Sequence, residues 1–289
     1  MVLACLPAGR ENGKLIGMNP FDVFLTTPIL NLLIAIFKLF DSLSLPGALG
    51  LSILALTVII RIIIWPLTTS QLKSTQKMAA LKPHLDRIKA EHGHDKIKHQ
   101  QEVTKLYKEH GVNPLSGCLL VLLQLPIFFA LYNVLNSIVQ FNQSDFLTNI
   151  NSRLYSSFLH LEKIPGTSFL GASLADKPSD FSKVGILILL VPILTGVFQF
   201  IQSKMIMPQT QPSSKVKKEG QKENMEDTMA QVSSQMTFIM PAMIAFFSYG
   251  FPFGLSIYWN TFTIMSIVQQ YMVAGAGGLS KYLPEKWRK

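Results

Sequence analysis

The chain has 289 residues, of which 48% are hydrophobic and 15% are charged, whereas soluble domains carry roughly 25% charged residues. Mean hydropathy is +0.31, and the apolar residues lie in several long runs, which argues against a single soluble domain. Lys and Arg number 26 against 17 Asp and Glu, and the resulting net charge of +9 fits either nucleic acid or anionic lipid. Because the basic residues lie between the apolar runs, the composition favours a membrane protein. Two cysteines, Cys5 and Cys118, are too few for a disulfide framework.

Residues 1–20 are expected to form a flexible N-terminal segment. The sequence that ends at Cys5 weakly resembles a lipoprotein cleavage site, but no charged or apolar leader precedes it. The match is therefore either chance or the trace of a missing upstream part.

Residues 21–43 are apolar enough to span a bilayer, yet they divide into two faces at helical spacing. A weaker polar stripe separates the apolar positions and consists of Thr27, Asn31, Ala35 and Lys38. We expect an amphipathic interfacial helix on the outer surface in preference to a sixth span. The apolar face consists of Ile29, Leu32, Leu33, Ile36, Phe37 and Phe40.

Crossing the hydrocarbon core takes about 20 apolar residues, and we predict five such spans. The fourth is short, and the turn Gly250–Gly254 joins it directly to the fifth, so these two are expected to form a tight antiparallel pair. Pro126, Pro192 and Pro241 lie inside the second, third and fourth spans and permit kinks that either open a groove or accommodate packing. The predicted spans are 48–68, 114–139, 183–205, 236–250 and 254–274.

Basic residues in the connecting segments predict the orientation, because Lys and Arg beside spans stay in the cytoplasm. Residues 69–113 hold nine, 206–235 hold four and the basic tail 275–289 holds four, which makes 17. The other side holds three in residues 1–46 and three in the loop 140–182, which makes 6. The N-terminus is therefore expected outside and the C-terminus in the cytoplasm.

The cytoplasmic segment 69–113 is expected to form an antiparallel helical hairpin. Its first apolar face consists of Met78, Leu81, Leu85 and Ile88, and its second of Val103, Leu106 and Tyr107. A turn at 92–95 joins them. Residues 206–235 mix Pro, Ser, Gly, Lys and Glu, which is typical of a mobile loop.

Arg61 lies about two turns inside a span and is costly there without water or a partner. One interpretation is that it snorkels to the cytoplasmic interface or binds helix carbonyls. The other is a wet cavity that awaits an anionic guest, because no Asp or Glu occurs within any predicted span. Other spans carry uncharged polar groups at similar depth, although each such group is commonly a helix-to-helix hydrogen bond. The candidate groove residues are Arg61, Thr57, Gln124, Gln199, Gln202, Tyr258 and Trp259.

The sequence gives no sign of covalent chemistry. It has no phosphate-binding glycine loop, no plausible Ser/His/Asp order and no carboxylate pair within the membrane. His92 and His94 lie in a turn beside Asp95, but no further fixed spacing supports a metal site. We therefore expect no catalytic residue, no cofactor and no metal.

Several stretches together resemble the YidC family of membrane protein insertases. The resemblance covers about residues 20 to 275 in order, including the loop lengths. The stretches are Val58–Thr68, Leu106–Lys108, Gly111–Cys118, Gln124–Tyr132, Phe251–Asn260 and Gln269–Gln270.

The resemblance implies an all-α membrane protein whose five spans enclose a hydrophilic groove open to the cytoplasm and to lipid. The groove arginine of the family matches Arg61, and its other groove positions match Thr57, Tyr258 and Trp259, with Gln124, Gln199 and Gln202 as weaker matches. On this resemblance we expect neither the first anchoring span and periplasmic domain of the Gram-negative form nor the long ribosome-binding tail of mitochondrial relatives, so ribosome docking through the tail is not expected.

The expected function is insertion and chaperoning of newly made membrane proteins without nucleotide hydrolysis. The expected location is a bacterial plasma membrane, with an organellar relative as the alternative. Nascent membrane proteins and anionic lipids are the expected partners, the Sec translocon and the ribosome are candidates, and sequence-specific nucleic acid binding is not expected. Two rival functions stay open: transport of a small anion through Arg61, and a membrane adaptor whose basic loops recruit cytoplasmic proteins.

Overall fold

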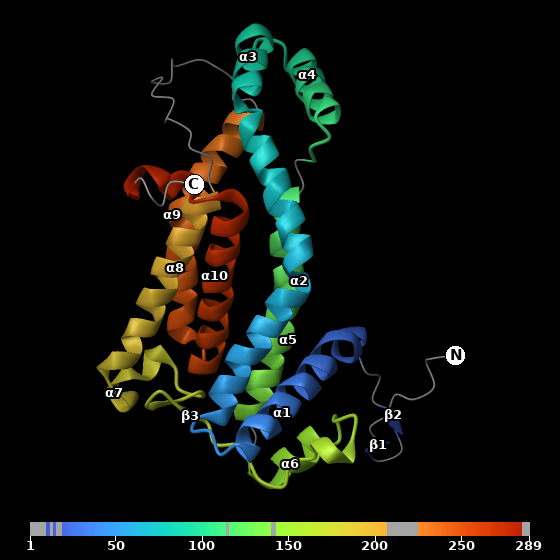
Figure 1. Cartoon of the computed structure of the whole chain (residues 1–289), viewed down its shortest axis with the longest axis vertical. Helices are drawn as coiled ribbons and strands as arrows, with labels where there is room; N and C mark the ends of the chain where they lie inside the picture. Colours follow the sequence, from blue (N-terminus) through green and yellow to red (C-terminus); the bar gives the residue numbers. More distant parts are fainter. Residues whose placement is uncertain are drawn as a thin grey trace. The chain divides into compact units, whose positions relative to one another are not determined.

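The computed structural model describes residues 10–11, 14–15, 19–113, 116–139, 143–206 and 225–284 (Figure 1). The expectations for Cys5, for most of the segment 1–20, for most of the loop 206–235 and for the end of the tail therefore fall outside the described residues. The chain divides into two compact units, each assembled from three stretches of sequence. The first unit comprises 1–62, 122–192 and 247–262, and the second comprises 63–121, 193–246 and 263–289.

The described chain is mostly α-helical, as the fold class predicted, and carries two antiparallel ladders of two residues per strand. The helices are α1 Thr27–Ser42, α2 Ala48–Ala80, α3 Lys82–His92, α4 Lys96–Glu109, α5 Ser116–Val139, α6 Gln143–Asn151, α7 Phe181–Val184, α8 Leu190–Ile206, α9 Met225–Gly250 and α10 Phe253–Ala274. The ladders pair β1 Arg10–Glu11 with β2 Lys14–Leu15, and β3 Ser168–Phe169 with β4 Ala172–Ser173.

Three helical segments of the described chain are long and apolar enough to cross a membrane: Asp22–Ser42, Ala48–Ala80 and Ile186–Ile206. Thr237–Gly250 is a shorter apolar helix. The first of these is the segment for which we expect an interfacial helix, and its length suits a span as well. The arrangement of five spans stays a prediction.

Two helix boundaries differ from those predicted for the spans. α2 continues to Ala80 instead of ending at 68, because residues 69–80 contain no Gly or Pro that would stop a helix. α8 begins at Leu190 after a 3-10 turn, so Pro192 lies in its first turn, where a missing N–H removes no helical hydrogen bond. Pro192 is therefore no source of a kink within this helix.

The first unit has an apolar core to which α1, α2, α5 and α10 all contribute. Leu33 of α1, Leu56 of α2, Leu131 of α5 and Leu255 of α10 are all completely buried in it. The polar stripe of α1 differs from its expected character, since Thr27 and Asn31 are buried while the apolar Leu32 is partly exposed. The reason lies in the loop that packs on this helix.

Residues 143–182 form a structured loop, here called the outer cap, which packs on α1. The Asn31 side chain donates from Nδ2 to the carbonyl oxygen of Arg153 at 3.0 Å and accepts from the Tyr155 N–H at 2.7 Å. These hydrogen bonds to the main chain of another segment satisfy the Asn31 amide, which explains why this polar side chain can be buried.

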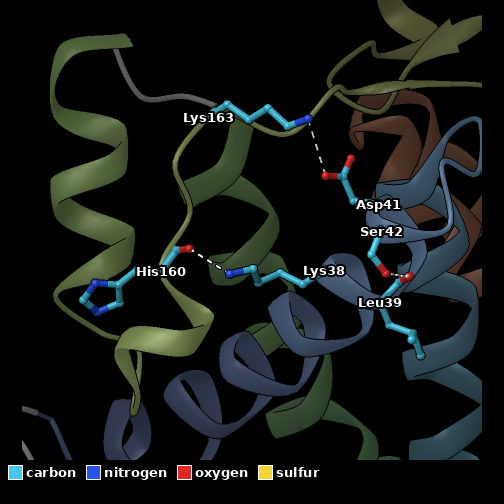
Figure 2. A network of polar contacts seen from close by, with 6 residues as sticks. All are labelled: Lys38, Leu39, Asp41, Ser42, His160 and Lys163. Atoms are coloured by element: carbon cyan, nitrogen blue, oxygen red, sulfur yellow. Dashed lines mark hydrogen bonds and ion pairs between the residues drawn. The ribbon is translucent and has the colours of Figure 1, made fainter.

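A second set of polar contacts joins the exposed end of α1 to the outer cap (Figure 2). Lys38 donates to the carbonyl oxygens of Phe158, at 2.6 Å, and His160, at 3.1 Å. The ring of His160 points away from Lys38, and Lys163 reaches back to Asp41 with 3.5 Å between Nζ and Oδ2. Both sets of contacts fix this loop to α1.

In the second unit, α3 and α4 form a helical hairpin with its own small apolar cluster. Leu81, Leu85, Leu106 and Val112 are buried there. The cluster is completed by Met78, Ile88, Val103 and Tyr107, so all seven residues of the two predicted apolar faces take part. Asp95 begins α4 by accepting from the backbone N–H groups of Ile97 and Lys98, which satisfies two donors that a helix start leaves open.

Candidate functional site

The candidate site begins with Thr57 and Arg61, which lie one turn apart on α2 in the first unit. Only 2% of Arg61 is exposed, and Thr57 is completely buried. Thr57 Oγ1 donates to the carbonyl oxygen of Ile53 at 2.6 Å, so this hydroxyl is satisfied within its own helix. Arg61 Cζ lies 4.4 Å from the centroid of the Phe262 ring on α10, a cation–π contact made where water is excluded.

A hydrogen bond between α5 and α10 continues the site. Tyr258 is completely buried, and its hydroxyl accepts from Gln124 Nε2 at 2.7 Å. The Tyr258 ring lies 6.1 Å from that of Phe262, which also faces Arg61. Arg61, Phe262, Tyr258 and Gln124 therefore form one continuous chain of contacts across three helices, here called the Arg61 cluster.

Trp259 belongs to the aromatic side of the Arg61 cluster. Its ring meets Phe128 of α5 edge-on, with 5.4 Å between centroids, and Phe128 also lies 5.8 Å from Phe251. Edge-to-face pairs of this kind stabilise beyond the apolar area that they bury. Trp259 is half-buried, as is Gln124.

Phe262 and Phe128 were not among the residues predicted for the site. Their spacing could have indicated them. Phe262 follows Tyr258 by four residues and Phe128 follows Gln124 by four, and residues four apart share a helix face. Gln199 and Gln202 lie on α8 in the second unit, where both are half-buried. Their membership of a common groove with Arg61 stays a prediction.

A second polar group, the glutamine pair Gln269–Gln270 of α10, lies in the second unit. Gln269 is completely buried; its Nε2 donates to Trp65 O and Thr69 Oγ1 at 2.9 Å each, and its Oε1 accepts from Thr68 Oγ1 at 2.9 Å. Gln270 Nε2 donates to the carbonyl oxygen of Met205 in α8 at 3.3 Å. Adjacent amides thus tie α10 to α2 beside Pro66 and to the last turn of α8.

The Arg61 cluster combines one fixed cation with neutral donors and aromatic faces. A guanidinium can attract an anion, and amide and hydroxyl groups can form hydrogen bonds with a polar chain, so this arrangement can bind anionic or polar groups.

The family of the chain follows from comparison with known proteins. Residues 39–277 match the model of the 60Kd inner membrane protein family. A protein of Fusobacterium nucleatum called membrane protein insertase YidC is 34% identical over 232 residues, which cover 80% of this chain and 88% of that protein. The chain belongs to the YidC family.

Other YidC-family proteins are longer than this chain. The YidC insertase of Rickettsia conorii is 34% identical over 228 residues, which are 78% of this chain and 35% of that protein. A crystal structure titled as an active YidC insertase with its first transmembrane domain resolved matches with a TM-score of 0.51 and 25% identity, covering 89% of this chain and 48% of that one. This chain therefore spans about a third of the one relative and about half of the other.

Proposed function

We propose that this chain is a membrane protein insertase and folding chaperone. It receives newly made membrane proteins in a hydrophilic groove that opens to the cytoplasm and to lipid, and it uses no nucleotide. The observation that carries the proposal is the Arg61 cluster, in which a buried cation, a tyrosine and a glutamine from three apolar helices meet in a chain of the YidC family. Relatives named as membrane protein insertases support it.

The physical task is to move a hydrophilic flank across hydrocarbon. Each peptide or charged group that enters the bilayer unsatisfied costs several kcal/mol. The Gln124 amide supplies a donor and the Tyr258 hydroxyl an acceptor within the predicted spans. If each exchanged their mutual hydrogen bond for a bond to a substrate, both groups would stay satisfied. Burial of the substrate's own apolar span in lipid, at about 25 cal/mol per Å², then drives release without nucleotide.

Arg61 is the attractive element of the groove. Its guanidinium keeps its charge because it does not deprotonate in proteins, and the Phe262 ring stabilises that charge without neutralising it. An acidic residue in the entering flank gains a charged partner that low-dielectric surroundings strengthen. We therefore expect acidic flanks to depend most on Arg61, with Thr57, Trp259, Gln199 and Gln202 completing the groove wall.

The proposed placement is the inner membrane of a bacterium, with the N-terminus outside and the C-terminus in the cytoplasm. The α3–α4 hairpin, whose segment holds nine Lys and Arg, would contact anionic lipid and receive substrate. The Sec translocon and the ribosome are the proposed partners on that side.

Insertion into liposomes tests the proposal. Purified chain is reconstituted, a single-span substrate with an acidic translocated flank is added, and protection of the flank from protease is scored. Arg61→Ala should abolish protection and Arg61→Lys should restore part of it, because Lys keeps the charge but loses the planar stack on Phe262. Lys177→Ala, which removes an exposed basic side chain outside both the Arg61 cluster and the α3–α4 hairpin, is the control.

Each result of this assay has a definite meaning. Failure of the unsubstituted chain to protect the flank refutes autonomous insertion. Equal protection by all four proteins removes Arg61 from the mechanism. Leakage of small anions from the same vesicles that Arg61→Ala stops, without any protection of the flank, would establish the rival transport function.

A further inference from the structure

The β3–β4 hairpin of the outer cap has an unusual residue at its tip. Ser168 pairs with Ser173 and Phe169 with Ala172, so Leu170 and Gly171 form a two-residue turn. Both turn residues have positive φ, +51° at Leu170 and +85° at Gly171. Turns of this kind favour Asn-Gly because an L side chain crowds the backbone in the left-handed region. The Leu170 side chain is nevertheless 82% exposed, so no packing within the described chain accounts for it.

The base of this hairpin is firmly held, so the tip has a defined position in the first unit. The buried Phe169 ring lies against Gly47 and Gly50, where an added Cβ would come within 2.7 and 2.3 Å of it. Ser173 Oγ donates to Thr167 Oγ1 at 3.0 Å, and the Leu174 N–H donates to the carbonyl oxygen of Thr167 at 2.8 Å. The Leu170 side chain is therefore exposed at a fixed position of the first unit.

The surroundings of the tip select the chemistry of its partner. Residues 164–175 contain no charged side chain, although Lys163 and Asp176 flank them directly. Ser168 and Ser173 lie at the base, and the large apolar side chain lies at the tip. A charged protein partner would require complementary charges around the tip. If the tip only faced water, Asn would suit this positive φ better than Leu. An apolar tip above hydroxyl groups fits the boundary between lipid headgroups and acyl chains.

The sequence that follows the hairpin leads directly to a lipid-compatible surface. Ile186 and Leu187, the first residues of the apolar segment Ile186–Ile206, are 73% and 76% exposed. Only 14 residues separate Gly171 from Ile186 along the chain. The hairpin therefore precedes the start of a predicted span, where the chain meets the bilayer surface.

We propose that the Leu170 tip inserts into the extracytoplasmic leaflet and seats the outer cap on the lipid. This goes beyond the insertase function and takes from it only the predicted side of the loop 140–182. The left-handed conformation of Leu170 is thereby explained: the apolar side chain gains burial in lipid that Asn at the same position would not gain.

Depth measurement by spin labelling tests this proposal. A nitroxide is attached at Leu170→Cys in a Cys5→Ser, Cys118→Ser chain reconstituted into phosphatidylethanolamine–phosphatidylglycerol vesicles. Glu162→Cys, an exposed position in the same loop, is the matched control. The measured quantity is the ratio of the nitroxide's collision rate with oxygen to its collision rate with a water-soluble nickel chelate. This ratio should be several-fold higher at position 170 than at position 162.

Two outcomes overturn the proposal. A ratio at position 170 equal to that of the control places the tip in water. Shielding from both oxygen and the chelate places it against protein. If the labelled chain does not fold, Leu170→Trp in vesicles with acyl-brominated lipid replaces it. The fluorescence that the new Trp adds should be quenched several-fold more than that added by Glu162→Trp. Equal quenching overturns the proposal. Neither readout depends on insertion activity, so failure here and failure of the proposed function are distinguishable.

Discussion

Asn31 offers the sharpest test of how the outer cap is held on α1. Asn31→Leu keeps the approximate side-chain volume but removes the amide. The substitution deletes the bond to the Arg153 carbonyl and the bond from the Tyr155 N–H, and also the bond from Nδ2 to the Thr27 carbonyl within α1. Because Asn31 is buried, the main-chain groups of the cap lose their partners without gaining an apolar contact that could compensate.

The expected cost follows from the two bonds that cross to the cap. Each net hydrogen bond contributes about 1 kcal/mol, and a buried donor left unsatisfied costs about 1–3 kcal/mol. Both cross-bonds are only partly buried, which places the sum near the lower end, at roughly 2–3 kcal/mol. Since about 1.4 kcal/mol corresponds to a factor of ten, the opened cap should become roughly 30- to 140-fold more populated.

Limited trypsin digestion in detergent measures this opening, because Arg153 and Lys163 lie within the cap and both faces of the protein are accessible. Cleavage at these sites should accelerate by about the same factor when opening precedes cleavage. Lys38→Met is the matched control: it also removes two bonds to cap carbonyls, but these are exposed, so less than about tenfold is expected. The reasoning is refuted if Asn31→Leu is cleaved no faster than Lys38→Met, in which case apolar packing alone holds the cap.

Three further predictions concern other parts of the chain. Gly50→Val forces a side chain into the Phe169 ring and should lower the melting temperature through about 1–3 kcal/mol of overpacking, while Gly166→Val, which meets nothing within 4 Å, should not. Gln269→Leu removes three bonds to α2 and should destabilise by about 1–3 kcal/mol in thermal unfolding; an unchanged melting temperature would show that packing alone joins these helices. The backbone N–H of Lys98, and to a smaller extent that of Ile97, donate to the Asp95 carboxylate and lower its pKa. The negatively charged cap therefore stabilises α4 at neutral pH, and this stabilisation is lost as the pH falls through the lowered pKa. Asp95→Ala should therefore speed hydrogen exchange in the first turn of α4 at pH 7, with the difference from the parent shrinking in acid.

The polar positions of the Arg61 cluster were predictable because a polar residue in an apolar span stands out in the sequence. Arg61, Tyr258 and Gln124 were found in this way, and the structure joins them through α10. Phe262 was missed because an aromatic residue in a predicted span has no contrast with its neighbours. Composition identifies what is costly in a membrane. The four-residue spacing places Phe262 on the same helix face as Tyr258, but only the structure shows that its ring lies against Arg61.

The fold was predictable where apolar residues recur at helical spacing on one helix face. It was less predictable where a helix packs against a loop. The apolar faces of the α3–α4 hairpin pack as their spacing predicts. On α1 the polar stripe predicted a boundary between lipid and water, but Asn31 binds the main chain of residues more than 120 positions away. A long-range bond to backbone atoms leaves no trace in the partner's side chains, so the sequence of the cap could not indicate it.

The contact between Arg61 and Phe262 bears on how the proposed site would bind and release a substrate. A carboxylate beside a buried arginine would form a strong charge pair, and an entering acidic residue would then have to displace it. The Phe262 ring lies against the guanidinium and stabilises the cation, yet it contributes no negative charge. The Tyr258–Gln124 bond is likewise between neutral groups, so its exchange for a bond to substrate changes the net hydrogen-bond energy little. Under the proposed insertase function, a site built from one cation, aromatic faces and neutral amides would attract an acidic flank and still release it, as repeated rounds of insertion would require.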